Sequence, residues 1–264
     1  MTKRVARTRR TKIEADVAKP CPKEKFFADI AEGESLRNAP VVKYVPATPN
    51  LKKAVAMLRD GVRILFLQGS AGTGKSMLAA WWAASLMKDK KIDKIYLVRA
   101  NVVSGKSAGM LPGTEFEKLQ PFFAQTLDHL GKFMGHGFLT YCLEKELIEL
   151  KSAEYIRGRS FENVCIIAEE CQNFTADDLE MLLTRLGNGT TYLMTGDAKQ
   201  NDLKGMSGLQ STLAMIEKTL ADEPSYMTDG DLDNLALIGS VTFMPEDCVR
   251  SGVTRSLVKM YYYS

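Results

Sequence analysis

One glycine-rich segment has the residue types and spacing needed to bind phosphate. Gly69-Ser70-Ala71-Gly72-Thr73-Gly74-Lys75-Ser76 matches G-x-x-x-x-G-K-[ST] in full, between an apolar stretch and a helical one. Its glycines let backbone N–H groups turn inward around phosphate oxygens, and the following helix aims its positive dipole end at the same anion. We expect Lys75 to reach the β- and γ-phosphates and the Ser76 hydroxyl to bind Mg²⁺. This context favours an ATP site over a flexible loop with a surface lysine.

Two adjacent carboxylates follow a second apolar stretch, residues 164–168, which reads as a buried strand. Ligands of open parallel sheets bind beyond the carboxyl ends of the strands, so Glu169 and Glu170 can lie beside the phosphate loop. We expect Glu169 to organise Mg²⁺ through a water molecule and Glu170 to act as the general base. The alternative is that both acids only stabilise the start of the next helix.

A third apolar stretch, residues 191–195, is followed by a polar segment that contains Gln200. Its amide is a candidate for sensing the γ-phosphate or for positioning the attacking water. An ordinary connection between a strand and a turn explains the same residues equally well.

The elements that must position these groups alternate along the chain. We predict strands at 63–67, 94–99, 155–157, 164–168, 191–195 and 241–243, and helices at 51–59, 76–87, 176–186, 209–220 and 253–262. Such alternation predicts an α/β fold with a mostly parallel sheet flanked by helices. Residues 115–150 have helical apolar spacing broken by glycines, and we interpret them as a helical insertion.

The first 47 residues differ in composition from the rest. They are charged and rich in turn residues, and six lysines and arginines fall among residues 1–12. We expect residues 1–47 to form a basic, partly disordered extension, either a solvated tail or an arm that grips a polyanion. Residues 48–264 then form one ATPase domain.

Composition limits the class of protein. The chain has 264 residues, 45% of them hydrophobic, a net charge of +3 and five scattered cysteines. It contains no apolar run of membrane-spanning length and no signal-like segment at its start. We therefore expect a cytoplasmic protein with reduced cysteines and no membrane partner.

Taken together and in this order, the motifs resemble the PhoH-like family, single-domain ATPases related to superfamily 1 helicases. Besides the segments above, the resemblance rests on VRANV at 98–102, GMLPG at 109–113, YIRGRSFEN at 155–163, TGDAKQND at 195–202 and DCVRS at 247–251. It extends from about residue 50 to residue 261. It implies a RecA-like fold, with Glu169 as the metal-binding acid and Glu170 as the general base. It also implies Gln200 as a phosphate sensor and Arg250 as the late arginine of the family.

Two positions depart from the family pattern. The family usually has aspartate where Glu169 stands, and the extra methylene matters because Mg²⁺ demands tight octahedral geometry. It also commonly has a glutamine that contacts adenine where this chain has Asn50. We therefore expect altered metal affinity or turnover. The choice between adenine and another nucleobase stays open.

Phosphoryl transfer gains from a positive group at the γ-phosphate, which two-domain helicases take from their second domain. This chain has one phosphate loop, so we expect a neighbouring copy in a head-to-tail ring to supply Arg250, or else Arg255. A hexamer follows by analogy with other single-domain motor ATPases. Arg157 and Arg159 suit the phosphates of a nucleic acid or a neighbouring subunit, although surface ion pairs explain them as well.

Three functions are compatible with these residues. The first is an ATP-driven remodeller of RNA or single-stranded nucleic acid that works as a ring oligomer. The second is a nucleotide-switched scaffold that recruits a nuclease without unwinding. The third is a kinase, which fits less well because Glu169, Glu170 and Gln200 suit activation of water better than transfer to an acceptor.

Overall fold

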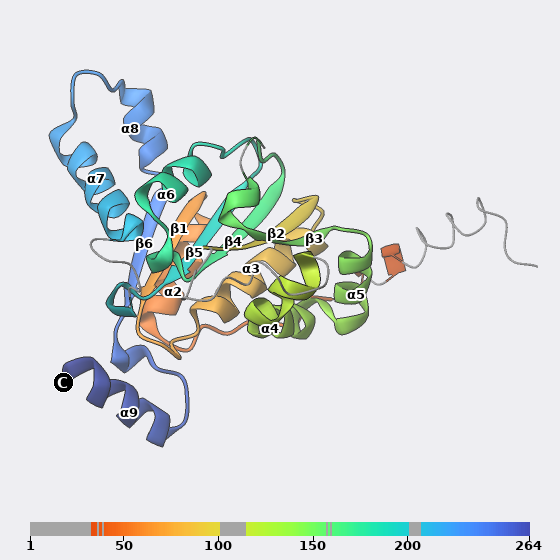
Figure 1. Cartoon of the computed structure of the whole chain (residues 1–264). Helices are drawn as coiled ribbons and strands as arrows, with labels where there is room; N and C mark the ends of the chain where they lie inside the picture. Colours follow the sequence, from red (N-terminus) through yellow and green to blue (C-terminus); the bar gives the residue numbers. More distant parts are fainter. Residues whose placement is uncertain are drawn as a thin grey trace, which may run out of the picture.

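A computed structural model describes residues 33–35, 37–38, 40–100, 115–156, 158, 160–200 and 207–264. Its centre is a six-stranded sheet (Figure 1) with the order β3-β2-β4-β5-β1-β6. Every neighbouring pair of these strands is parallel. The strands are β1 (Ile64–Gly69), β2 (Lys94–Arg99), β3 (Ile148–Ser152), β4 (Val164–Glu169), β5 (Thr191–Gly196) and β6 (Ile238–Phe243). The α/β fold with a parallel sheet predicted from the sequence is confirmed.

The strand order decides which residues meet. β1, which leads into the phosphate loop, pairs with β5, and β5 pairs with β4, which ends at Glu169. Because all strands run in one direction, the residues after β1, β4 and β5 emerge at the same edge of the sheet. β4 is buried along its whole length, as expected for a central strand covered on both faces.

Helices cover both faces of the sheet. One face packs against α2 (Pro49–Arg59), α3 (Lys75–Lys88), α4 (Glu115–Met134) and α5 (His136–Glu144). The other packs mainly against α6 (Ala176–Leu183) and α7 (Gly208–Asp222). Alternate residues of each strand point to opposite faces, so in β1 Leu65 and Leu67 enter the first core while Phe66 enters the second. This double burial fixes the register of the central strands.

The segment predicted as a helical insertion is helical as far as Glu144, in α4 and α5, while its last residues belong to β3. The predicted strand at 155–157 is wrong, because Ala153–Ile156 form a 3₁₀ turn and position 157 lies outside the described residues. β3 pairs only with β2, at the edge of the sheet, and its buried and half-buried residues alternate. Such a pattern is weak beside the apolar runs of the central strands.

Residues 40–47 belong to the segment predicted as an extension. Within it the Val42 amide donates to the Phe133 carbonyl at 3.0 Å, and the Tyr44 ring stacks on Trp81 with 5.0 Å between centroids. The end of this segment therefore packs against α3 and α4.

Two helices lie toward the C-terminus. The N-terminus of α8 (Asp229–Leu235) carries a capping box between Thr228 and Asp231. α9 (Gly252–Tyr263) stands apart from the sheet (Figure 1) and buries none of its residues. No helix in the described parts of the chain has both the length and the apolar character needed to cross a membrane.

Candidate active site

The phosphate loop connects β1 to α3 and depends on backbone conformations that favour glycine. The φ angles are 116° at Gly69, 72° at Gly72 and 89° at Gly74. A Cβ atom on Gly69 would lie 2.0 Å from the Phe243 carbonyl oxygen at the end of β6. Glycine is therefore required there both by the φ angle and by the neighbouring strand.

Lys75 is the first residue of α3, and its side chain folds back into the loop. Its Nζ donates to the carbonyl oxygens of Gly69 at 2.7 Å and Ser70 at 2.8 Å. Burial lowers the pKa of Lys75 to about 8, while the charges of Asp197 and Glu170 act in the opposite direction. An anion bound in the loop would favour the charged amine in the same way.

A cavity of about 470 Å³ opens beside the loop at the carboxyl ends of the strands. It brings together most of the candidate residues, although they lie far apart in the sequence. Among its lining residues are Ala71, Gly72, Thr73, Gly74, Lys75, Ser76, Glu169, Glu170, Gln200 and Arg250. α4 also contributes side chains to this wall, namely Phe122, Gln125, Thr126 and His129.

Glu169 ends β4 and is only 8% exposed. Burial raises its pKa to about 7, against the opposing effects of a hydrogen bond from Thr126 and the charge of Arg99. Arg99 lies beside it in register at the end of β2. Thr126 Oγ1 donates to Glu169 Oε1 from α4. The carboxylate is thus held by Thr126, and Glu169 lines the same cavity as the phosphate loop.

Glu170 takes a left-handed conformation, with φ at 51°, immediately after β4. A non-glycine residue in this region stores strain of about 1–3 kcal/mol, which the surrounding contacts must offset. Gln172 provides one of these contacts, because its Nε2 donates to Glu170 Oε2 at 2.6 Å. Its Oε1 accepts from the Asp197 amide at 3.0 Å, so one buried side chain links the turns after β4 and β5.

Sequence reasoning assigned no role to Gln172, Thr126 or Asp197. Gln172 follows the two acids closely in the sequence, but only its position between two turns shows what it does. Gln200, in contrast, was a candidate, and it lines the cavity as a member of a 3₁₀ turn. Its Nε2 donates to Asp197 Oδ2 at 3.0 Å, which holds the amide beside the acidic pair.

Arg250 lies over the phosphate loop of its own chain. A Cβ built on Gly72 would lie 3.0 Å from Arg250 Cδ, and the adjacent Val249 amide donates to the Gly72 carbonyl at 3.0 Å. The segment that carries Arg250 is thus bonded to the phosphate loop of its own chain, while a role of Arg250 at a neighbouring subunit stays a prediction. Its guanidinium can act within its own chain.

A second cavity, of about 660 Å³, is lined by residues 47–50, 244 and 246–249 and by Arg255, and it shares Val249 with the first. Asn50 lines it, and its Nδ2 donates to Asp247 Oδ2 at 2.7 Å and to the Thr242 carbonyl at 3.2 Å. Both partners are acceptors, so the NH₂ group must face them. Only the Asn50 carbonyl oxygen is left for a ligand.

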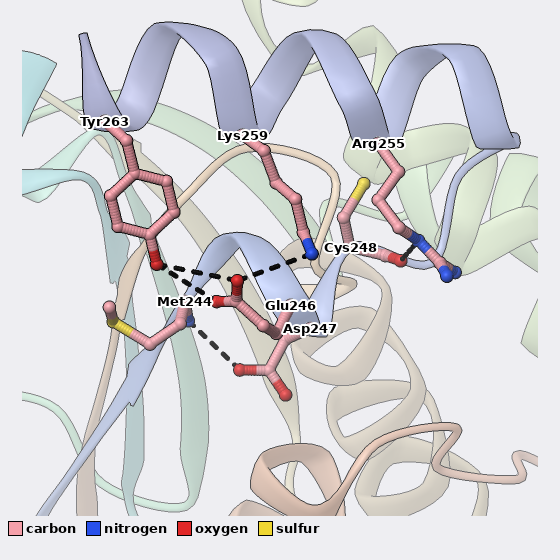
Figure 2. Close-up of polar contacts among 7 residues, drawn as sticks. All are labelled: Met244, Glu246, Asp247, Cys248, Arg255, Lys259 and Tyr263. Atoms are coloured by element: carbon pink, nitrogen blue, oxygen red, sulfur yellow. Dashed lines mark hydrogen bonds and ion pairs between the residues drawn. The ribbon is translucent and has the colours of Figure 1, made fainter.

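α9 borders this second cavity and is tied to the short turn η5 (Pro245–Asp247), as Figure 2 shows. Arg255 Nε donates to the Cys248 carbonyl at 3.1 Å, and Lys259 pairs with Glu246 at 3.5 Å. The Asp247 carboxylate accepts from the Met244 amide at 3.0 Å as well as from Asn50, so the backbone of this turn fixes the carboxylate that holds Asn50. These contacts use the polar side of α9.

The donor set suits a magnesium ion carried by a nucleotide. Among the described residues, no three His, Cys, Asp or Glu side chains form a metal cluster. Mg²⁺ in phosphoryl-transfer sites uses one or two protein ligands and completes its shell with phosphate oxygens and water. Ser76 and Glu169 would be the protein ligands here. In the same loop, the buried Ser70 hydroxyl has no partner among the described residues.

Arg157 and Arg159 lie outside the described residues. Four cysteines, Cys142, Cys165, Cys171 and Cys248, are free and buried, as predicted for packing thiols.

Comparison with known proteins gives one family. Residues 43–262 match the family model described as "PhoH-like protein". The chain is 34% identical over 232 residues to Protein PhoH of Escherichia coli K12, covering 86% of this chain and 60% of that protein. It is 37% identical over 174 residues to a PhoH-like protein of Mycobacterium leprae, with 65% and 50% covered. The chain thus spans about half to three fifths of the length of these relatives.

Among solved structures, a similar chain is the Sulfolobus solfataricus SWI2/SNF2 ATPase core in complex with dsDNA. Its TM-score is 0.42 at 16% identity, over 77% of this chain and 46% of that one.

Replacing Gly69 with alanine tests the geometry of the loop. We expect G69A to lower the free energy of unfolding by more than about 1 kcal/mol, because the new Cβ meets the β6 backbone and alanine disfavours this φ. Urea denaturation measures the change. The control is G252A on α9, where a Cβ meets nothing within 4 Å. Equal stability of G69A and wild type would contradict the close approach of β6.

Proposed function

The chain belongs to the PhoH-like family, and from its active site we propose that it binds Mg-ATP and hydrolyses it. The observation that carries the proposal is the convergence of Lys75, Glu169 and Glu170 on one cavity at the carboxyl ends of β1 and β4. A lysine for phosphate, an acid for metal and an acid for water are the groups that ATP hydrolysis requires.

Each residue has a distinct task in this proposal. The loop amides and Lys75 bind the phosphates, and Glu170 accepts the proton of the attacking water. Gln172 holds the Glu170 carboxylate in place, and Gln200 senses the γ-phosphate beside Asp197. Arg250 offsets developing negative charge from within its own chain. Mg²⁺, when bound through Ser76 and Glu169, supplies charge that stabilises the transferring phosphoryl group.

We further propose that RNA or single-stranded nucleic acid stimulates the reaction. The basic N-terminal residues and the pair Arg157 and Arg159 support this in the sequence. At the rim of the first cavity, the Arg99 guanidinium lies 5.4 Å from the centroid of the half-exposed Phe122 ring. An exposed ring beside a cation is a surface on which a base can stack.

Turnover measurements test the activity and its acid. Glu170→Gln keeps the size of the side chain but cannot accept a proton, so we expect kcat to fall about 10²- to 10⁴-fold while ATP still binds. ATP turnover is followed with and without RNA and single-stranded DNA. Glu180→Gln, an exposed acid on α6, is the matched control. Full activity in E170Q would remove Glu170 as the base, and no activity in wild type under any condition would remove the ATPase proposal.

We propose that the base of the nucleotide occupies the second cavity and that Asn50 selects it. With its NH₂ group engaged by Asp247 and Thr242, Asn50 offers only an acceptor. Adenine presents an amino group to such an acceptor, whereas guanine presents a carbonyl oxygen. Asn50 in place of the glutamine typical of the family therefore still favours ATP.

Competitive binding of ATP and GTP tests this choice. We expect wild type to prefer ATP by about 10- to 100-fold. With GTP, the Asn50 carbonyl oxygen would face the guanine carbonyl oxygen, and neither acceptor would have a donor. Asn50→Ala should bring the ratio of the two dissociation constants close to one. Asn234→Ala, an exposed asparagine on α8, should keep the wild-type ratio. Equal affinity of wild type for both nucleotides would rule out selection by Asn50.

Assembly into a ring remains part of the proposal. α9 supports it, because Val253, Leu257, Met260 and Tyr261 are 74%, 46%, 52% and 77% exposed. Their spacing along the helix places them together on one side. The same stripe would serve the alternative function, a scaffold that recruits a nuclease.

Sedimentation velocity distinguishes these uses of α9. In the presence of Mg²⁺ and a non-hydrolysable ATP analogue we expect an oligomer of wild type, six copies in our proposal. Leu257→Asp should dissociate it, because a charge is costly in an apolar interface. Met215→Asp introduces the same charge at an exposed site on α7 and should not. A wild type that sediments only as a monomer would refute the ring and leave the scaffold.

A further inference from the structure

Thr126 joins α4 to the end of β4 inside the protein. It is 1% exposed, and its hydroxyl donates to Glu169 Oε1. The two residues come from different layers, since α4 covers one face of the sheet and Glu169 ends a central strand. A buried hydrogen bond to a carboxylate is worth more than one between neutral groups, because the charge has little water around it.

The direction of the Thr126 hydroxyl is informative because a helix offers it a nearer partner. Threonine in a helix can donate to the carbonyl four residues earlier, as Thr184 does to the Glu180 carbonyl at 2.7 Å. Thr126 donates to Glu169 instead. The Glu169 carboxylate needs donors where it is buried, and Thr126 supplies one of them.

α4 is also tied to the neighbouring strand one turn earlier. Arg99 Nη1 donates to the Phe122 carbonyl at 3.3 Å, and Arg99 ends β2 in register with Glu169. Phe122 and Thr126 are four residues apart and thus lie on the same side of the helix. Two strand ends are therefore fixed by one turn of α4.

We propose that Thr126 is a positioning residue for the metal: by holding Glu169 Oε1, it directs the other carboxylate oxygen toward the cavity where Ser76 and the nucleotide phosphates meet. The inference rests on the proposed function and deepens it, because it makes α4 part of the metal site. Partners that orient a metal ligand typically change metal affinity 10- to 100-fold when they are removed.

Metal binding to the nucleotide complex tests the role of Thr126. Mn²⁺ is titrated into protein saturated with a non-hydrolysable ATP analogue and followed by electron paramagnetic resonance. We expect Thr126→Val, which keeps the shape but removes the donor, to weaken Mn²⁺ binding about 10- to 100-fold. Nucleotide binding without metal should stay unchanged. Thr126→Ser restores the donor and should return affinity to near the wild-type value.

Thr212→Val is the matched control, since Thr212 is a buried helical threonine outside both cavities. If T126V fails to fold, Thr126→Ala removes the same donor without adding a methyl group and carries the same expectation. Wild-type Mn²⁺ affinity in a folded T126V or T126A would overturn the role of Thr126 alone. Failure of wild type to bind the nucleotide would overturn the proposed function as well.

A double-mutant cycle separates a direct bond from a general loosening of α4. Glu169→Asp shortens the side chain by one methylene, which withdraws the carboxylate from Thr126. Adding T126V to E169D should therefore change Mn²⁺ affinity less than twofold. An equally large effect of T126V in both backgrounds would show that the hydroxyl acts by another route and would overturn the proposal.

Discussion

The site depends on placing charged side chains of opposite sign at one edge of a parallel sheet. Lys75, Glu169 and Glu170 lie after β1 and β4, where they are partly or wholly shielded from water. Burial acts against the charges of Lys75 and Glu169, lowering the pKa of Lys75 to about 8 and raising that of Glu169 to about 7. Such groups persist only when nearby donors and acceptors stabilise them. The turns and helices around this edge supply those partners.

The phosphate loop could be predicted from the sequence because its requirements are local. Positive φ angles and a close approach of backbone demand glycine, and the residues involved stand next to one another. The central strands could also be predicted from the sequence, because a strand buried on both faces has a continuous run of apolar residues. β3 was missed for the opposite reason. Its residues, IELKS, alternate at the edge of the sheet, and they follow directly on two helices whose apolar spacing extends toward them.

The partners of the acids could not be predicted, because they depend on how distant elements pack. Thr126 lies 43 positions from Glu169 in the sequence, and only the docking of α4 on the sheet brings its hydroxyl to the carboxylate. Gln172 is closer, but its role appears only when the turns after β4 and β5 face each other. The place of Arg250 could not be predicted either, since nothing in its motif says that its side chain lies beside Gly72 of its own phosphate loop.

The two departures from the family pattern are each accompanied by a local contact. Glu169 has one methylene more than aspartate, and this length brings its carboxylate to Thr126 on the neighbouring helix. Asn50 has one methylene fewer than glutamine, and its amide is held close to the backbone by Asp247 and Thr242. The longer side chain of Glu169 is fixed by Thr126, and the shorter side chain of Asn50 is fixed by Asp247. Either position alone predicts only altered metal affinity or an open choice of nucleobase, whereas in our proposal the pairs Glu169–Thr126 and Asn50–Asp247 each leave one oxygen free for a ligand.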